Sequence, residues 1–187
     1  IRIGESVVRM AGIGDVFTHP DARGKHVSSH LMNDSVEYMR REAFPLSMLY
    51  GIPNFYHKFG YIEAMGDPKI FLPVKNAAPI TSDMVPRACA ARDIPDLNRL
   101  YNQAYSSKTG SIRRIPESWY NIADPKTLFV FPDRKDKPAG YCIYKTIWGG
   151  GGYISEVVAP MEEVRIAALA FAVQKAREAF QAEVEFH

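Results

Sequence analysis

The sequence has few cysteines, no strong excess of either charge and no long apolar run. Its 187 residues include two cysteines, Cys89 and Cys142, so disulfides cannot hold the fold together. Neither lies in a CxxC or zinc-type spacing, which is typical of reduced thiols in a cytoplasmic protein. No apolar stretch approaches the roughly 20 residues of a membrane span, and the first residues carry no apolar secretory core. We therefore expect a cytoplasmic protein with no membrane partner.

The charge balance excludes another class of partner. The chain has 23 basic and 21 acidic side chains, which gives a formal charge of +2. A protein whose main task is to bind nucleic acid would show a marked basic excess, so we expect no nucleic acid partner. Apolar residues make up 47%, with ten Tyr, ten Phe and two Trp, which argues against disorder. The length allows one or two globular domains.

The chain contains an internal repeat. The segment 13–17 (IGDVF) resembles 154–158 (ISEVV) at an offset of 141, and the tetrad REAF occurs at 41–44 and again at 177–180, at an offset of 136. Each copy reads as a strand, an amphipathic helix and a short strand. We interpret the chain as two partial copies of one α/β fold. The alternative is one larger α/β domain that contains two similar strand–helix units.

Hydrophobic periodicity and turn residues predict the order of the elements. Strands are expected over 6–13, 14–18, 46–50, 61–72, 85–91, 127–131, 139–147, 153–158 and 182–186, with a Gly-Asp-Pro turn interrupting 61–72 and a glycine-rich turn at 148–152. Helices are expected over 25–42, 94–105, 116–122 and 164–180, with Asp93 as an N-cap, and a short helix or turn is expected over 54–59. The segment 73–84 contains two Pro, one Ser, one Thr and one Asn and is predicted to be a linker. The domains are therefore expected to span 1–72 and 85–187.

One loop carries the pattern of an anion site. After the strand 14–18, a short loop with Arg23, Gly24 and Lys25 opens directly onto the helix 25–42. A helix N-terminus offers unpaired N–H groups and the positive end of a dipole, which favours a phosphate or pyrophosphate. The alternative is an ordinary polar connection between a strand and a helix.

Two motifs resemble a known superfamily. The segment 20–31 (PDARGKHVSSHL) resembles the acetyl-CoA pyrophosphate loop of the GNAT N-acetyltransferases, which reads Arg/Gln-x-x-Gly-x-Gly/Ala. Arg23 fits the first position, whereas His26 and Ser28 stand where the pattern has glycine. The segment 50–61 (YGIPNFYHKFGY) resembles the second hallmark of the superfamily. With a second copy behind a linker, the chain looks like part of the tandem-GNAT enhanced intracellular survival family.

The resemblance implies a fold, a cosubstrate and a set of site residues. The fold would be α/β (α+β), with a GNAT-like mixed central sheet flanked by helices in two partial tandem copies. The cosubstrate would be acetyl-CoA, with pantetheine on the backbone after the first strand and pyrophosphate on the loop amides. The implied cofactor-binding residues are Val16, Phe17, Thr18, Arg23, Gly24, Lys25, His26, Val27, Ser28 and Ser29. Tyr56 would be the catalytic residue that protonates the departing thiolate.

The predicted function is an acetyl-CoA-dependent N-acetyltransferase that acts by direct attack of a primary amine on the thioester. The acceptor would be a small-molecule amine or a lysine. The general base is not identified, and homo-oligomerisation stays open. One rival is a catalytically inactive GNAT-fold module that binds a ligand or partner, and another is a metal hydrolase with zinc on His19, His26 and His30. We expect no metal, and no acetyl-CoA on the second copy, where Glu162 and Glu163 begin the helix.

Overall fold

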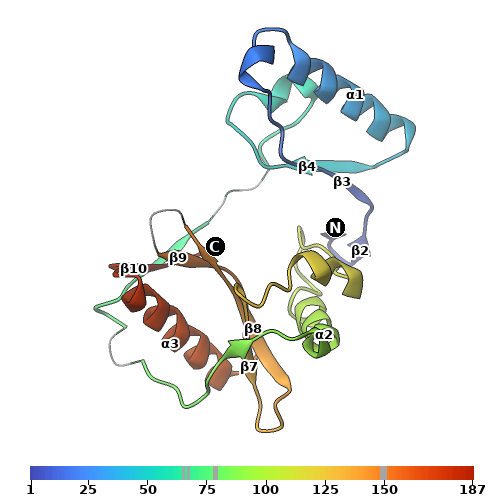
Figure 1. Ribbon diagram of the computed structural model, residues 1–187. Coiled ribbons are helices and arrows are strands. Elements are labelled where there is room, and N and C mark those ends of the chain that lie inside the picture. Colours follow the sequence, from blue (N-terminus) through green and yellow to red (C-terminus); the bar gives the residue numbers. More distant parts are fainter. Residues whose placement is uncertain (65, 67, 78–79, 148–150) are drawn as a thin grey trace. The chain divides into compact units, whose positions relative to one another are not determined.

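The computed structural model describes residues 1–64, 66, 68–77, 80–147 and 151–187 (Figure 1). The chain divides into two compact units. The first unit comprises Ile1–Gly66 together with Ser107–Ile112, and the second comprises Asp67–Ser106 together with Arg113–His187. Among the described residues, no helix is both long and apolar enough to span a membrane.

The first unit is built around a strand–helix–strand motif. Its elements are β1 (Arg2–Ile3), β2 (Ser6–Val7), β3 (Met10–Ile13), the 3-10 helix η1 (Pro20–Ala22), α1 (Val27–Arg41), β4 (Leu46–Leu49) and the 3-10 helix η2 (Tyr56–Phe59). Strand β3 pairs in parallel with β4, and β1 pairs antiparallel with β2. Helix α1 buries Met32 and Met39, which lie seven residues apart on one face.

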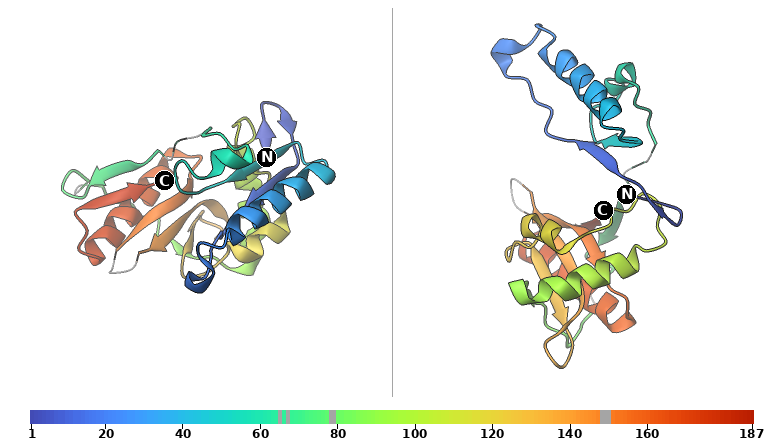
Figure 2. Two further views of the ribbon diagram at one scale, coloured as in Figure 1. Left: turned by 90° about the horizontal axis from the view of Figure 1, so that it is seen from above. Right: turned by 90° about the vertical axis from the view of Figure 1, so that its right-hand side faces the viewer.

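The second unit is a six-stranded mixed sheet with helices on both faces. Its elements are β5 (Ile70–Pro73), β6 (Arg87–Ala88), η3 (Ala91–Asp93), α2 (Ile94–Ala104), η4 (Pro116–Asn121), β7 (Leu128–Pro132), β8 (Pro138–Thr146), β9 (Gly152–Val158), α3 (Glu162–Glu178) and β10 (Glu183–Phe186). The strand order is β5-β10-β9-β8-β7-β6, and β9 and β10 are the parallel pair. Figure 2 shows α2 and α3 on opposite faces of this sheet.

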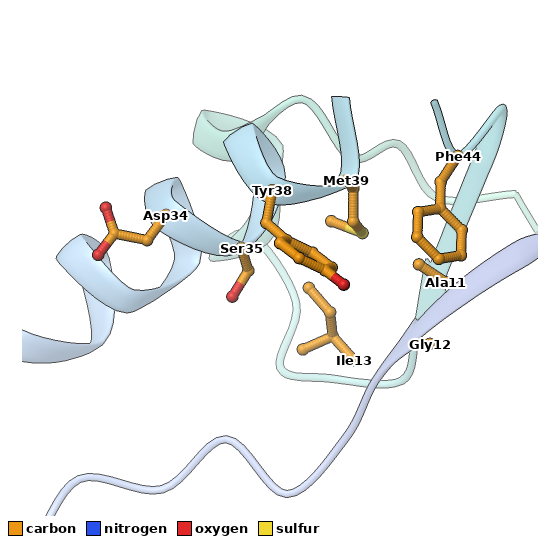
Figure 3. Close-up of a pocket in the computed structure, with 8 residues that line it drawn as sticks. All are labelled: Ala11, Gly12, Ile13, Asp34, Ser35, Tyr38, Met39 and Phe44. Carbon is orange, nitrogen blue, oxygen red and sulfur yellow. The ribbon is translucent and has the colours of Figure 1, made fainter. Parts of the chain in front are cut away.

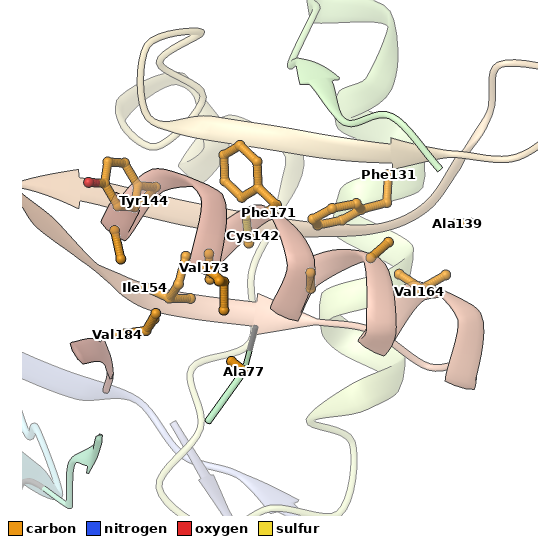
Figure 4. Packing of buried hydrophobic residues seen from close by; sticks show 14 residues of the cluster. Ala77, Phe131, Ala139, Cys142, Tyr144, Ile154, Val164, Phe171, Val173 and Val184 are labelled. Atoms are coloured by element: carbon orange, nitrogen blue, oxygen red, sulfur yellow. The ribbon is translucent and has the colours of Figure 1, made fainter. Parts of the chain in front are cut away.

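Two apolar clusters fill the second unit, one on each face of the sheet. The cluster under α3 includes Phe131, Ile154 and Phe171 (Figure 4). The cluster under α2 and η4 includes Trp119 and Tyr141. Burial of these large side chains is the main favourable contribution to folding of this unit. The expected α/β fold with a mixed sheet flanked by helices is therefore confirmed.

The boundaries between the units differ from the predicted domains 1–72 and 85–187. Strand β5 belongs to the second unit, because Ile70–Pro73 pairs antiparallel with β10. The predicted linker 73–84 is not a free connection, since Ala77 is fully buried and Val74 packs against the core. The segment Ser107–Ile112 joins the first unit through hydrogen bonds of Arg2 with Ser111 and Gly110. The composition of a segment does not reveal a pairing partner that lies far away in the sequence, so these unit boundaries could not be predicted.

Several predicted strands are shorter than expected. No strand forms at 14–18, and of the range 61–72 only Ile70–Leu72 is in a strand among the described residues. Of the range 85–91, only Arg87–Ala88 is in a strand. The predicted strand 6–13 is divided into β2 and β3, which have different partners. The segments predicted at 54–59 and 116–122 form the 3-10 helices η2 and η4, and the other predicted helices and strands are present with shifted ends. The glycine-rich turn 148–152 lies partly outside the described residues, as do residues 65 and 67 of the range 61–72.

The repeat in the sequence corresponds to a strand–helix–strand motif that occurs once in each unit. Ile13 pairs with Leu49 in the first unit, and Ile154 pairs with Phe186 in the second. The first strands are thus offset by 141 and the second strands by 137. The two helices end in the same pattern, since the N–H of Phe44 bonds to the carbonyl of Met39 and the N–H of Gln181 to that of Ala176. The helix ends are therefore also offset by 137, whereas the identical REAF letters are offset by 136. The structural equivalence thus differs by one residue from the alignment of the identical letters.

Candidate functional site

The backbone changes direction directly after β3. Strand β3 ends at Ile13, opposite the last residue of β4, and Asp15 has a φ of 52°. This left-handed conformation cannot continue a strand, which is why the predicted strand 14–18 does not form. Val16 and Thr18 are half-buried, and the side chain of Phe17 is 74% exposed. The backbone of Val16, Phe17 and Thr18, predicted to bind pantetheine, is therefore extended chain outside the sheet.

A short turn then leads from η1 into α1. His19 precedes η1, and its Nδ1 accepts a hydrogen bond from the N–H of Asp21 at 3.4 Å. Gly24 has a φ of 76° and His26 a φ of 56°, whereas the φ of Lys25 between them is not positive. Alternation of this kind turns successive N–H groups toward one side of the chain, as in anion-binding backbone nests. His26 is also the N-cap of α1, and its side chain makes no capping hydrogen bond.

The backbone amides at this turn have no acceptor within the described chain. They are the six consecutive N–H groups of Gly24, Lys25, His26, Val27, Ser28 and Ser29. The first amide with a partner is that of His30, which bonds to the carbonyl of His26 at 3.0 Å. Orphan donors of this kind require water, a side chain or a ligand. The structure therefore presents a row of free donors at the positive end of a helix.

Two cations stand next to these donors. Arg23 and Lys25 are exposed, and neither forms an ion pair with any described residue. Gly24 has open space where a Cβ would stand, so a ligand can approach its backbone. The ten predicted cofactor-binding residues thus lie on one continuous segment between β3 and the first turn of α1. Their chemistry suits a diphosphate, because free amides and a guanidinium both bind phosphate oxygens.

Tyr56 begins η2, which packs against α1. Its ring lies edge-on to Phe55, with centroids 5.0 Å apart, and edge-on to Tyr61 at 6.4 Å. Tyr61 is held in turn by a hydrogen bond of 2.7 Å between its hydroxyl and that of Ser47 on β4. The ring also covers the backbone of Gly51, where any Cβ would overlap it. The Tyr56 hydroxyl makes no hydrogen bond to a described residue, so it is available as a proton donor.

No metal site forms around the histidines. The described residues contain no group of three His, Cys, Asp or Glu side chains placed to hold a metal ion. His19 instead lies beside Asp21, with Nδ1 and Oδ2 3.5 Å apart on the exposed surface. The structure thus gives no support to the hydrolase interpretation with zinc on His19, His26 and His30.

The start of α3 in the second unit differs from the start of α1 in its side chains and in its backbone conformation. The N-cap of α3 is Met161, which is extended, and Glu162 and Glu163 occupy the first turn. No residue from Pro160 to Val164 has a positive φ. Carboxylates suit the positive helix end but repel a phosphate. The left-handed residues that shape the turn after β3 have no counterpart after β9, although the amides of Glu162, Glu163 and Val164 also have no acceptor among the described residues.

The second unit holds a half-buried polar cluster that the sequence analysis did not identify. Arg114 donates two hydrogen bonds of 2.7 Å to Glu156, and the Tyr141 hydroxyl donates a third to the same carboxylate. Burial and the adjacent Glu156 raise the pKa of Tyr141 far above its usual value. The guanidinium lies 3.8 Å from the centroid of the Tyr101 ring. Because the charged groups satisfy one another, the cluster supports the fold and presents no open site.

Both thiols are buried and free. Burial, together with the nearby Asp93, raises the pKa of the Cys89 thiol to about 11, and burial raises that of Cys142 well above its usual value. Neither is therefore a thiolate near neutral pH, and neither is placed to act as a nucleophile.

The first unit matches a known family. Residues 1–64 match the family model described as the acetyltransferase (GNAT) domain. This segment contains the free amides and Tyr56, so the resemblance that the two motifs suggested is confirmed for the part of the chain that holds the site. None of the curated proteins compared matches the chain.

Solved structures share the fold over almost the whole chain. A GCN5-related N-acetyltransferase from Anabaena variabilis is 23% identical with a TM-score of 0.70, over 95% of this chain and 47% of that one. The one from Kribbella flavida is 20% identical with a TM-score of 0.67, over 96% and 45%. Eis1 from Mycobacterium abscessus is 20% identical with a TM-score of 0.55, over 98% and 50%. At these identities the likeness concerns the fold, and the chain spans about half the length of these structures.

Proposed function

We propose that the chain is part of an acetyl-CoA-dependent N-acetyltransferase whose cosubstrate binds the first unit. The observation that carries the proposal is the row of free amides from Gly24 to Ser29 at the start of α1. These donors, with Arg23 and Lys25, would hold the pyrophosphate of coenzyme A. The match of residues 1–64 to the GNAT domain supports the same role.

The acetyl group would pass directly from the thioester to a primary amine. The backbone at Val16, Phe17 and Thr18 would bind pantetheine and polarise the thioester carbonyl through an N–H group. Tyr56 would give its proton to the departing thiolate, since its hydroxyl has no partner that would compete for it. The buried, high-pKa thiols fit a route without an acyl-enzyme intermediate. The acceptor would be a small-molecule amine or a lysine.

The second unit would be a degenerate copy of the same fold that binds no acetyl-CoA. The shared strand register and helix ends support a common origin of the two units. Glu162 and Glu163 at the start of α3 support the loss of anion binding there. We propose a cytoplasmic protein on the basis of its reduced thiols.

The rival is an inactive GNAT-fold module that binds a ligand or partner. His26 favours it, because this side chain occupies a left-handed position where the superfamily pattern has glycine. Calorimetric titration with coenzyme A tests whether the chain binds the cofactor at all. We expect binding, weakened about tenfold in Arg23→Ala by the loss of a charged hydrogen bond and unchanged in the control Arg134→Ala. Absence of binding at millimolar coenzyme A would remove both the cosubstrate and the transferase.

Replacement of Tyr56 by Phe tests the catalytic proposal. The ring and its contacts with Phe55 and Tyr61 persist, whereas the proton donor is lost. We expect kcat to fall by about 10² while coenzyme A affinity stays within twofold. Steady-state kinetics with a panel of primary amines, alongside calorimetry, measure the two quantities. Unchanged turnover would exclude Tyr56 from the mechanism, and turnover absent even in the unaltered chain would favour the inactive module.

A further inference from the structure

Tyr56, the proposed proton donor, begins a short helix that ends in a defined way. Gly60 follows η2 with a φ of 90°, and its N–H bonds to the carbonyl of His57 at 3.0 Å. The N–H of Tyr61 bonds to the carbonyl of Tyr56 at 3.4 Å. These two bonds are those of a Schellman motif, in which the residue after the left-handed glycine commonly contacts a residue in the last turn of the helix. Tyr61 and Tyr56 are these two residues, and their rings meet edge-on.

The far end of the Tyr61 ring is tied to the sheet. Its hydroxyl shares a hydrogen bond of 2.7 Å with the hydroxyl of Ser47 on β4. Ser47 is the register partner of Ala11 on β3, and directly paired residues point to the same side of a sheet. Figure 3 shows Ala11 and Ile13 on the side of β3 that faces Met39 of α1. Ser47 therefore meets Tyr61 on the side of the sheet that α1 covers.

Three groups enclose the Tyr56 ring. The ring of Phe55 contacts it edge-on at 5.0 Å and the ring of Tyr61 at 6.4 Å between centroids. A Cβ on Gly51 would stand 2.7 Å from Cζ of Tyr56, the carbon that bears the hydroxyl. Phe55 adjoins Tyr56 in the chain, and Gly51 lies between β4 and η2. Of the three groups, Tyr61 is thus the one that a side-chain bond fixes to a strand.

We propose that Ser47 and Tyr61 are positioning residues that hold the hydroxyl of Tyr56 at the place where it donates its proton. This inference rests on the proposed function of Tyr56. The bond between the two hydroxyls fixes the Tyr61 ring to β4, and the edge of that ring limits the orientation of the Tyr56 ring. A small displacement of a group that must meet a reacting atom lowers the rate of reaction. Loss of the bond should therefore lower turnover, although neither hydroxyl touches the substrate.

The bond also has a simpler structural role, which is to satisfy two hydroxyls that are partly buried. Ser47 lies on a strand whose four residues are all half-buried, and an unpaired hydroxyl in such a place costs free energy. If this were its whole role, removal of the bond would lower the stability of the fold and leave kcat of the folded protein unchanged. Positioning differs in one respect, because it acts through the hydroxyl of Tyr56.

Steady-state kinetics of the 187-residue chain test the proposal. Tyr61→Phe and Ser47→Ala each remove the bond and keep an aromatic ring at position 61. We expect each to lower kcat about fivefold, a typical effect of one neutral hydrogen bond, while coenzyme A affinity stays within about twofold. The double variant should be about as active as either single variant, because both changes remove the same bond. Ser47→Thr keeps the hydroxyl and should stay within about twofold of the unaltered chain.

The same changes in a Tyr56→Phe background distinguish positioning from a structural role. Tyr61→Phe should alter kcat there by less than about twofold, because the hydroxyl that it orients is gone. The matched control is Tyr120→Phe, which removes the hydroxyl of an exposed tyrosine in the second unit and should leave kcat unchanged in both backgrounds. An equal fall of kcat with and without the Tyr56 hydroxyl overturns the proposal, as does full turnover of Tyr61→Phe and Ser47→Ala.

A second measurement reads the Tyr56 ring directly. In the chain labelled with 13C at the ε carbons of tyrosine, the Tyr56 signal is identified by its absence from Tyr56→Phe. We expect Tyr61→Phe and Ser47→Ala to move this signal toward that of an exposed tyrosine, and Tyr120→Phe to leave it in place. If the unaltered chain shows no turnover, the proposed function fails and the inference fails with it. If turnover depends on Tyr56 but its signal does not move, the positioning role alone is overturned.

Discussion

At the scale of the residue, His26 is the most unusual part of the amide row. Its φ of 56° lies in the left-handed region, where a side chain other than glycine carries a cost of about 1 kcal/mol. Gly24, two residues earlier, is also left-handed but has no such cost, and Val27 begins the regular helix. The exposed imidazole makes no capping bond that would offset the strain.

Replacement of His26 by Gly should strengthen coenzyme A binding several-fold. Glycine adopts the same φ without strain and removes a side chain beside the donors, while its greater freedom in the unfolded chain keeps the stability change within about 1 kcal/mol. Calorimetry and urea denaturation measure the two effects. His26→Ala is the matched control, since it removes the imidazole but keeps the left-handed strain. Equal affinities of the glycine and alanine variants would show that the backbone conformation is not what limits binding.

Position 51 requires glycine because the Tyr56 ring leaves no space for a Cβ, and not because of its backbone conformation. Its φ is not positive, but a Cβ there would overlap the Tyr56 ring. Gly51→Ala should therefore destabilise the chain by about 1–3 kcal/mol and displace the Tyr56 hydroxyl, which lowers turnover. In a Tyr56→Ala background the same change should cost less than about 0.5 kcal/mol, because the ring is gone. Urea denaturation of the four proteins completes the cycle, and an equal cost in both backgrounds would contradict this contact.

At the scale of the element, the start of α2 depends on one ion pair. The buried carboxylate of Asp93 accepts two hydrogen bonds from Arg87 on β6, at 2.7 and 2.9 Å, and one from the N–H of Ala90. Burial alone would raise the pKa of Asp93, but these donors outweigh it and lower the pKa below its usual value. The predicted N-cap therefore anchors the segment before the helix, through η3, without a capping bond to α2 itself.

Replacement of Asp93 by Asn should lower the free energy of unfolding by about 2–4 kcal/mol at neutral pH, because Arg87 loses its buried partner. The folded-state pKa of Asp93 is depressed, so its stabilisation is fully present above the unfolded pKa of about 3.9 and is lost as the pH falls through the folded value. The two proteins should thus converge in stability toward pH 2. Urea denaturation at pH 7, 4 and 2 measures the difference. A difference that does not shrink with acid would exclude the carboxylate as its source.

The elements also show what local sequence could and could not predict. Periodic apolar residues located α1, α2 and α3, and β-branched runs located β7, β8 and β9, because burial imposes those patterns. The extended segment 14–18 was predicted as a strand, since the sequence does not reveal the left-handed Asp15. Strand β5 pairs with a strand more than 100 residues later, and this partner decides to which unit Ile70–Pro73 belongs. The residues of the candidate site are contiguous in the chain, so the sequence alone was enough to group them as a prediction.

At the scale of the whole molecule, the repeat explains why one unit would bind the cosubstrate and the other would not. Both share a parallel strand pair, a connecting helix and unpaired amides at the start of that helix, but only the first has positive φ angles between strand and helix. The second unit instead starts α3 with two glutamates and carries its own extensive core. We therefore expect that the chain binds one coenzyme A, on the first unit.

The most direct measurement of the central claim is the amide spectrum of the 15N-labelled chain during a titration with coenzyme A. We predict that the amides of residues 24–29 shift downfield as they bond to the diphosphate, with saturation at one equivalent, and that the amides of residues 161–164 do not move. Desulfo-coenzyme A, which keeps the diphosphate, should give the same shifts. Unchanged amides at residues 24–29 in millimolar coenzyme A, or shifts confined to other residues, would contradict the account.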